Sequence, residues 1–192
     1  KNNVFMHSRE MIPMQSFDVI IWVAGHSSVA MCKLDPPSAY ANNVLYFKQF
    51  INEYCQLDEE QKPLLIIASS SSVYGKKYSM CEEHFSLPES ISDYDSSMKM
   101  REEHLAASNV NAVVLRLGTV CGAGINHRSE LMINSMVKSA CETGKIYISN
   151  PETKRSILFN RDLAMIVIKI IEKNVVEKIT GLNIFNAGTW NM

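Results

Sequence analysis

The chain has 192 residues, of which 46% are hydrophobic and 20% are charged, and its formal net charge is -1. These values are ordinary for a globular protein, and the balanced charge argues against nucleic acid or a membrane surface as a partner. No apolar run approaches the ~20 residues that a membrane-spanning helix needs. The five cysteines are odd in number and lack C-x-x-C spacing, which favours reduced thiols in a cytoplasmic protein over a disulfide framework.

Three apolar runs alternate with helical patterns in the first part of the chain. Residues 18–24 read DVIIWVA, which is typical of a strand buried on both faces of a parallel sheet. An aspartate followed by two prolines predicts a helix start at residue 35, and apolar residues at helical spacing extend this helix to residue 54. Residues 64–68 and Ala112–Leu117 are the other two apolar strands, and a helix is expected between them over residues 93–108.

The last part of the chain is less regular. Its patterns predict a helix at 129–143, short strands at 145–148 and 156–159, a helix at 160–173 and a last strand at 182–185. The alternation of strands and helices predicts right-handed crossovers and a doubly wound parallel sheet. The sequence thus indicates an α/β fold, with the parallel sheet in residues 1–125 and a smaller mixed lobe in residues 126–192.

Small and polar residues follow each of the three apolar strands. Ala24 and Gly25 follow the first strand, serines fill positions 69–72 after the second, and Gly118 follows the third. In doubly wound sheets ligands bind beyond the carboxyl ends of the strands, and glycine lets a ligand approach the backbone closely. We therefore expect a ligand site where these strand ends meet. The histidines are scattered without the spacing of a metal site, so no metal is expected.

Six segments, in order along residues 18–188, resemble the motifs of the extended short-chain dehydrogenase/reductases of the NAD-dependent epimerase/dehydratase (nucleotide-sugar) family. DVIIWVAGHSSV is similar to the family's DVVIHLAA strand, and the segment up to Asn43 to the DP…N pattern that follows it. LLIIASSSSVYG is similar to the family's serine-rich strand end, and VVLRLGTVCGAG to LRxxNVYGPG. Arg155 and Asp162 have the spacing of RDYIHVxDLA, and GLNIFNAG resembles GxxYNVG. The resemblance implies a Rossmann-like sheet for the cofactor and a lobe for the substrate.

The resemblance implies a reversible hydride transfer at a carbon of a nucleotide-activated sugar, with NAD or NADP as the cofactor. In the family a tyrosine exchanges a proton with the sugar hydroxyl, a lysine four residues later lowers the pKa of that tyrosine, and a serine or threonine hydrogen-bonds the reacting oxygen. The serine falls on Ser70, with Ser71 and Ser72 beside the substrate, and Arg155 resembles the arginine that grips the diphosphate.

The resemblance also implies which residues line the cofactor and how the protein occurs. The implied cofactor-binding residues are Ala24, Gly25, Asn43, Leu117, Gly118 and Thr119. The implied protein is a cytoplasmic homodimer that epimerises, dehydrates or reduces its sugar.

The tyrosine and the lysine of the family do not stand four residues apart in this chain, which reads YDSSMK from Tyr94. If Tyr94 is the catalytic tyrosine, the lysine position holds Met98. If Lys99 is the catalytic lysine, the tyrosine position holds Asp95. The serine and the acidic pair that follow favour the Tyr94 register, because the family often reads Y-x-x-S-K-x-x-x-E.

In the Tyr94 register the positive charge must come from another side chain. Lys99 is the nearest cation in sequence, so we expect Ser70, Tyr94 and Lys99 to be the catalytic residues. Five residues correspond to about 140° around a regular helix, so Lys99 needs a π-bulge or an irregular first turn to reach Tyr94. Arg101 is the second candidate for the cation.

The glycine-rich G-x-x-G-x-x-G loop that should precede the first apolar strand is not present in the chain. Residues 1–17 contain no glycine, and the chain begins with Lys1 rather than Met. We therefore expect either a piece of a longer enzyme or a degenerate paralogue. The alternative function is a non-catalytic relative that binds a nucleotide or a partner subunit, and Met98 and the missing loop favour it.

Overall fold

A computed structural model describes residues 14–75, 81–108, 110–125, 128–148, 151–152, 154–188 and 190–191. The strands within these ranges are β1 (Val19–Trp22), β2 (Leu64–Ser70), β3 (Ala112–Leu117), β4 (Thr119–Cys121), β5 (Ser156–Phe159), β6 (Leu182–Ala187) and β7 (Trp190–Asn191). The α-helices are α1 (Val29–Leu34), α2 (Pro36–Tyr40), α3 (Tyr46–Cys55), α4 (Asp93–Ala107), α5 (Met132–Thr143) and α6 (Asn160–Val176). A π-helical segment is Ala41–Leu45, and short 3-10 helices are Met14–Ser16, Glu59–Gln61 and Ser71–Tyr74.

Four strands form the main sheet in the order β1-β2-β3-β6, and every neighbouring pair is parallel. The three apolar runs of the first part of the chain are therefore strands, and they lie side by side. The register places Ser70 of β2 opposite Leu117 of β3, and Leu117 opposite Ala187 of β6. The carboxyl ends of three strands thus meet at one edge of the sheet, where doubly wound folds bind their ligands.

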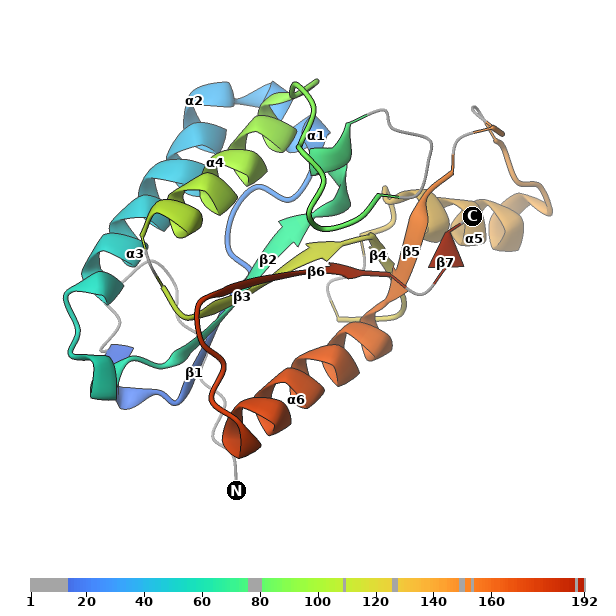
Figure 1. Ribbon diagram of the computed structural model, residues 1–192. Helices are drawn as coiled ribbons and strands as arrows, with labels where there is room; N and C mark the ends of the chain where they lie inside the picture. Colours follow the sequence, from blue (N-terminus) through green and yellow to red (C-terminus); the bar gives the residue numbers. More distant parts are fainter. Residues whose placement is uncertain are drawn as a thin grey trace.

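Helices cover both faces of the main sheet, as Figure 1 shows. Helices α3 and α4 lie on one face, where Phe47 and Leu105 pack in one core with Leu65 of β2. Helix α6 lies on the other face, and its apolar side chains pack in a second core with Ile66 of β2. Leu65 and Ile66 reach opposite faces because side chains alternate along a strand. Each fully buried side chain of this size contributes about 1.5–3 kcal/mol through removal from water.

The helical segment predicted from residue 35 starts there and contains a π turn, and the short helix α1, which was not predicted, precedes it. Asp35 is its cap, because Oδ1 accepts a hydrogen bond from the backbone N–H of Ser38 at 3.1 Å. Pro36 stands in the first turn, where the helix needs no backbone N–H. The π turn at Ala41–Leu45 places Asn43 in the interior, with 0% of its surface exposed. This buried amide holds the loop that follows β1, through hydrogen bonds with the backbone of His26.

A second, smaller sheet is formed by β4, β5 and β7. The chain does not remain in this lobe, because β6 pairs with β3 and α6 packs on the main sheet. The division at residue 125 therefore does not separate two contiguous units, since residues 160–187 return to the parallel sheet.

Residues 145–148, expected to be a strand, have no strand conformation. Gly144 ends α5 in the left-handed conformation at φ 70°, and the residues after it are exposed, with Tyr147 at 75%. Apolar residues gave this segment its strand pattern, but within the described ranges no neighbouring strand pairs with it.

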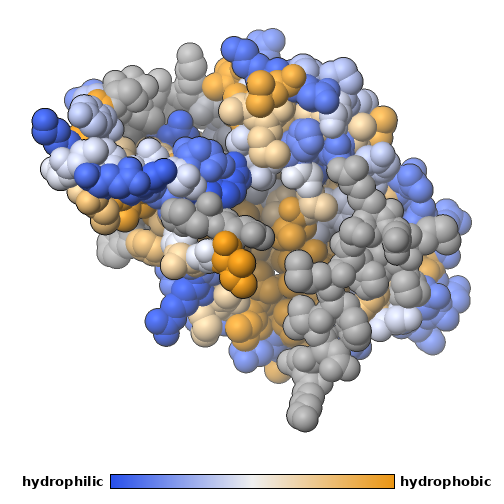
Figure 2. All heavy atoms as spheres, turned by 180° about the vertical axis from the view of Figure 1, so that it is seen from behind, coloured by the Kyte–Doolittle hydropathy of each residue, from blue (hydrophilic) through white to orange (hydrophobic). Residues whose placement is uncertain are grey.

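Strand β1 lies at the edge of the main sheet as described, and it leaves apolar side chains in contact with solvent. Ile21 is 46% exposed and Val23 is 72% exposed. Apolar side chains also gather near the middle of the molecular face seen from behind (Figure 2). None of the described helices is long and apolar enough to span a membrane.

Candidate functional site

A cavity of about 830 Å³ lies at the carboxyl ends of β2, β3 and β6. Ligand pockets in proteins commonly measure about 300–1,000 Å³. The serines at positions 69–72 line the cavity from the end of β2, and Tyr94 lines it from the first turn of α4. Leu117, Gly118 and Thr119 line it from the end of β3. Two of the three polar strand ends, together with the candidate tyrosine, therefore surround one cavity.

Ser70 and Tyr94 lie together at the wall of this cavity, and the Ser70 hydroxyl is close enough to the Tyr94 phenol to favour its ionised form. The Oγ of Ser70 also accepts a hydrogen bond from the backbone N–H of Ser72 at 3.2 Å, which caps the 3-10 helix after β2. Burial raises the pKa of Tyr94, while the Ser70 hydroxyl and the positive charge of Arg101 act in the opposite direction. The pair presents a hydroxyl and a phenol together to a ligand in the cavity.

Helix α4 begins regularly, and this separates Lys99 from Tyr94. Ser92 is the N-cap, with its Oγ accepting the backbone N–H of Asp95 at 3.2 Å, and the helix is α-helical over all of Asp93–Ala107. The expected irregular first turn is therefore absent from α4, and Lys99 stays about 140° around the helix from Tyr94. Lys99 is half-buried and does not line the cavity.

Met98 occupies the position one helical turn after Tyr94, where the family has its lysine. Its side chain is 3% exposed and packs with Val73 and Tyr74, and the Tyr94 ring packs against the same cluster. The position is thus filled by an apolar side chain, which belongs to the cluster that Tyr94 packs against and carries no charge.

Ala24, Gly25 and Asn43, expected at the cofactor, do not line the cavity. Asn43 instead holds the loop after β1, since its Oδ1 accepts the backbone N–H of His26 at 2.7 Å and its Nδ2 donates to the His26 carbonyl at 3.1 Å. Gly25 has a φ of 128°, and a Cβ there would lie 2.3 Å from Asn43 Oδ1, so a side chain does not fit. From the same loop it is Ser27 that lines the cavity.

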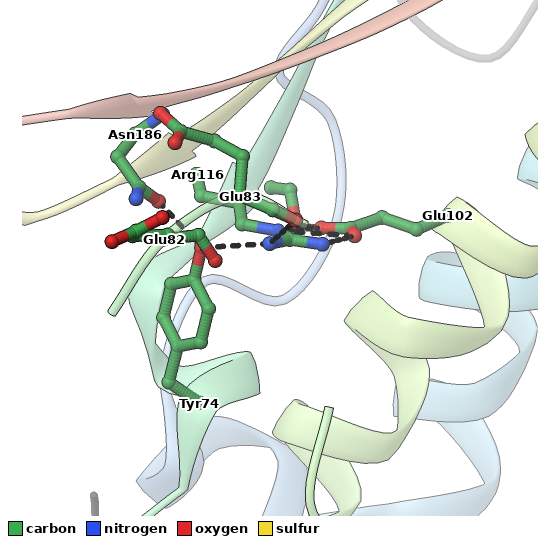
Figure 3. A network of polar contacts seen from close by, with 7 residues as sticks. Tyr74, Glu82, Glu83, Glu102, Arg116 and Asn186 are labelled. Atoms are coloured by element: carbon green, nitrogen blue, oxygen red, sulfur yellow. Dashed lines mark hydrogen bonds and ion pairs between the residues drawn. The ribbon is translucent and has the colours of Figure 1, made fainter. Parts of the chain in front are cut away.

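Arg116 of β3 stands at the centre of a buried polar network that the sequence analysis missed (Figure 3). Its guanidinium donates to both carboxylate oxygens of Glu102 from α4, with Nη2 and Oε2 at 2.7 Å. Its Nη1 donates to the Tyr74 hydroxyl at 2.7 Å, which in turn donates to Asn186 Oδ1 at 2.8 Å. The sequence signal was a lone arginine in the apolar segment AVVLRL. A charged side chain in a strand that is buried on both faces of the sheet needs a partner.

This network forms part of the cavity wall and joins four segments of the chain. Arg116, Tyr74 and Asn186 all line the cavity. Burial alone would lower the pKa of Arg116, but its hydrogen bonds with Glu102 and Tyr74 outweigh this effect and raise the pKa. Arg116 therefore remains charged at any pH at which the fold survives, and it connects β3, α4, β6 and the 3-10 helix after β2 around the site.

Three basic side chains line the cavity from the lobe, namely Arg128, Lys154 and Arg155. Arg155 is exposed. Arg128 was not foreseen: its Nη1 donates to Ser27 Oγ at 2.7 Å, a residue 101 positions away in the chain. No local pattern reveals such a contact, because only the folded chain brings the two segments together.

The lining suits a polar, phosphorylated ligand. The Oγ of Ser72 is buried and has no hydrogen-bond partner among the described residues, so an oxygen of a ligand can satisfy it. The hydroxyls and the three cations of the lining fit sugar hydroxyls and phosphates, which a nucleotide sugar and a nicotinamide cofactor both contain. In the part of the chain that the structure describes, no three His, Cys, Asp or Glu side chains group as metal ligands.

A comparison with family models finds a match over residues 7–188 to the model described as NAD dependent epimerase/dehydratase family. Among curated proteins, none matches the chain.

Solved structures with the same fold include the following three proteins. UDP-glucuronic acid 4-epimerase from Bacillus cereus, in complex with UDP-glucuronic acid and NAD, has a TM-score of 0.77 and 21% identity over 92% of this chain and 55% of that chain. MoeE5, in complex with UDP-glucose and NAD, has a TM-score of 0.75 and 22% identity over 94% of this chain and 61% of that chain.

TunA, an NAD-dependent NDP-hexosamine 5,6-dehydratase involved in tunicamycin biosynthesis, has a TM-score of 0.75 and 16% identity over 93% of this chain and 57% of that chain. The chain thus spans 55% to 61% of the length of these three proteins. At such identities the likeness establishes the fold.

Proposed function

The chain belongs to the NAD-dependent epimerase/dehydratase family, and on this premise we propose that it acts on a nucleotide-activated sugar with NAD or NADP. The observation that carries the proposal is the Ser70–Tyr94 pair, which faces a cavity at the carboxyl ends of a parallel sheet. Structures of similar fold hold a UDP-sugar together with NAD. Epimerisation, dehydration and reduction are the proposed reaction classes, since each begins or ends with hydride transfer at a sugar carbon.

Bound NAD or NADP supplies the hydride acceptor or donor. The Tyr94 Oη exchanges a proton with the sugar hydroxyl, and the Ser70 Oγ hydrogen-bonds the same sugar oxygen. A phenol ordinarily titrates near 10, so a nearby positive charge is needed for Tyr94 to act as a base near neutral pH. Ser71 and Ser72 contact the sugar, and the backbone at 117–119 holds the cofactor.

The cations of the lobe bind the diphosphate of the substrate. Arg155 and Arg128 each offer a planar fork of donors, which suits phosphate oxygens, and Lys154 adds a third positive charge to the same cavity. Because Arg155 is exposed, a phosphate can reach it without displacing a protein partner from the interior.

Turnover of a panel of UDP-sugars with NAD or NADP, followed by proton NMR, tests the proposal. Tyr94→Phe and Ser70→Ala are each expected to lower kcat by about 100-fold or more, as for the loss of a general base or its partner. Arg155→Ala is expected to raise KM with little change in kcat, because it removes binding shared by substrate and transition state.

Tyr40→Phe is the matched control, since Tyr40 is 46% exposed on α2 and does not line the cavity. Its turnover is expected to equal that of the wild type. Wild-type turnover in Tyr94→Phe, or no reaction with any sugar of the panel, would contradict the proposal.

A further inference from the structure

Arg101 is a buried cation without a carboxylate partner. It is 3% exposed, and within the described ranges no acidic side chain lies within ion-pair distance of it. Its guanidinium is held by the backbone, with Nε donating to the Asn43 carbonyl at 2.5 Å and Nη2 to the Ala24 carbonyl at 3.0 Å. A buried charge without an anion is costly. The two carbonyls, the Asn43 side-chain oxygen at 3.4 Å from Nη2 and the Phe47 ring at 5.3 Å from Cζ stabilise this cation without neutralising it.

The guanidinium extends toward Tyr94 along one face of α4. Tyr94, Met98 and Arg101 are spaced i, i+4 and i+7, which places them on the same face of a regular helix. Helical side chains lean toward the N-terminus, and Arg101 does so, because its Nη1 lies 4.0 Å from the Sδ of Met98. Met98 in turn packs in the cluster against which the Tyr94 ring lies.

The Nη1 of Arg101 has only this sulfur as a partner among the described residues. A thioether is a weak acceptor, so the donor that faces the tyrosine side of the helix keeps most of its hydrogen-bonding capacity. A lysine at position 98 would bring a second cation into this space and repel the guanidinium, whereas the uncharged Met98 leaves room for it.

We propose that Arg101 is the positioning residue that supplies the positive charge beside Tyr94, in place of the lysine that the family carries one turn after its tyrosine. The proposal rests on the proposed function for its catalytic meaning. When the sugar hydroxyl is oxidised, the Tyr94 phenolate takes its proton and becomes a neutral phenol. Arg101 remains protonated throughout, so that it stabilises the phenolate without transferring a proton itself.

The ionisable groups around Tyr94 identify Arg101 as the source of favourable charge. Burial raises the pKa of Tyr94, and Asp95 on α4 and, once it is ionised, the Cys32 thiol on α1 act in the same direction. The Ser70 hydroxyl and Arg101 lower it. Burial lowers the pKa of Arg101 to about 10, while Tyr94 and Cys32 raise it, so Arg101 is a cation at neutral pH.

Titration of the Tyr94 phenol tests the proposal directly. The protein is labelled with tyrosine carrying carbon-13 at Cζ, the Tyr94 signal is assigned by its loss in Tyr94→Phe, and the titration is repeated in the variants. Arg101→Gln, which keeps a donor for the backbone carbonyls but removes the charge, is expected to raise the Tyr94 pKa by about one unit or more. Arg101→Lys is expected to leave it within about half a unit of the wild type, because the charge is retained.

Lys99→Met is the matched control, and its Tyr94 titration is expected to equal that of the wild type. An unchanged titration in Arg101→Gln, or a shift in Lys99→Met of the size expected for Arg101→Gln, overturns the proposal. If Arg101→Gln does not fold, the Tyr94 pKa in Lys99→Met, a substitution at a half-buried position, is the test. An unchanged Tyr94 pKa in Lys99→Met supports Arg101 as the source of the charge, and a raised Tyr94 pKa refutes it. The titration uses neither cofactor nor sugar, so its outcome is separate from that of the turnover assay.

Discussion

Replacement of Glu102 by glutamine is expected to lower the free energy of unfolding by about 3–5 kcal/mol, because it leaves a buried guanidinium without its anion. Glu102 and Arg116 are 5% and 4% exposed. The carboxylate accepts hydrogen bonds from Nε and Nη2 of Arg116 and from Ser69 Oγ at 2.5 Å. Glutamine keeps the length of the side chain and one oxygen acceptor. The decrease in the free energy of unfolding therefore measures the effect of removing the charge, and not an effect of changed packing.

Urea unfolding followed by circular dichroism measures this free energy, and a double-mutant cycle with Arg116→Met isolates the pair. Each single substitution leaves one charge buried alone, whereas the double variant leaves none. We therefore expect the double variant to be more stable than the sum of the two losses predicts, by about 2 kcal/mol or more.

The exposed pair Arg128–Glu130 provides the control for this experiment. Its side chains are 31% and 63% exposed, and the Nε–Oε1 distance is 2.7 Å. Because exposed ion pairs contribute about 0–1 kcal/mol, Glu130→Gln should change stability by less than about 1 kcal/mol. A loss of the same small size in Glu102→Gln, or strictly additive losses in the cycle, would refute the argument that burial makes the Arg116–Glu102 pair important.

Two further predictions concern buried polar positions. Burial raises the pKa of Tyr54 to about 12, so the fold favours its neutral phenol: this stability is complete below pH 10 and is lost as the pH rises toward 12, by about 3 kcal/mol. Tyr54→Phe should reduce that alkaline loss in urea unfolding at pH 7 and pH 11, at a cost near neutral pH of about 1 kcal/mol for its hydrogen bond to the Pro63 carbonyl. Gly25→Ala should destabilise the protein by about 2 kcal/mol or more, because φ is positive and the new Cβ meets Asn43 and Arg101. Gly124→Ala, with no atom near its Cβ position, should be close to neutral in the same urea unfolding assay.

Local sequence patterns predicted those strands whose packing partners the same patterns also predict. The strand Ala112–Leu117 was predicted with its observed bounds, because a continuous apolar run is buried on both faces by the helices that alternate with it. Residues 145–148 were wrongly predicted as a strand, since a strand also needs a partner and the pattern does not say whether one exists. The serines at 69–72 were placed at the cavity for a similar reason, because strand ends of one parallel sheet meet at one edge. Tyr94 was placed there by the order of the motifs in the family that the sequence resembles.

The polar contacts that shape the site could not be predicted in the same way. Distance along the sequence made Lys99 the nearest cation to Tyr94, but the regular start of α4 turns it to another face. Arg101 is two residues further along the chain than Lys99, and yet it lies on the same face of α4 as Tyr94. From the sequence Arg101 was only the second candidate, because its burial depends on Asn43, which a π turn carries into the interior.

Adjacent residues of α4 fasten this helix on two sides, and this determines where the Tyr94 phenol lies. Arg101 binds the carbonyls of Ala24 and Asn43 on the side of β1, and Glu102 binds Arg116 on the side of β3. Tyr94 stands two turns before both contacts on a rigid helix, and its partner Ser70 stands at the end of β2, between those two strands. A change at either contact therefore moves the phenol relative to Ser70 as well as altering charge. Loss of turnover in Glu102→Gln with an unchanged Tyr94 titration would reflect displacement, whereas loss in Arg101→Gln with a raised titration would reflect charge.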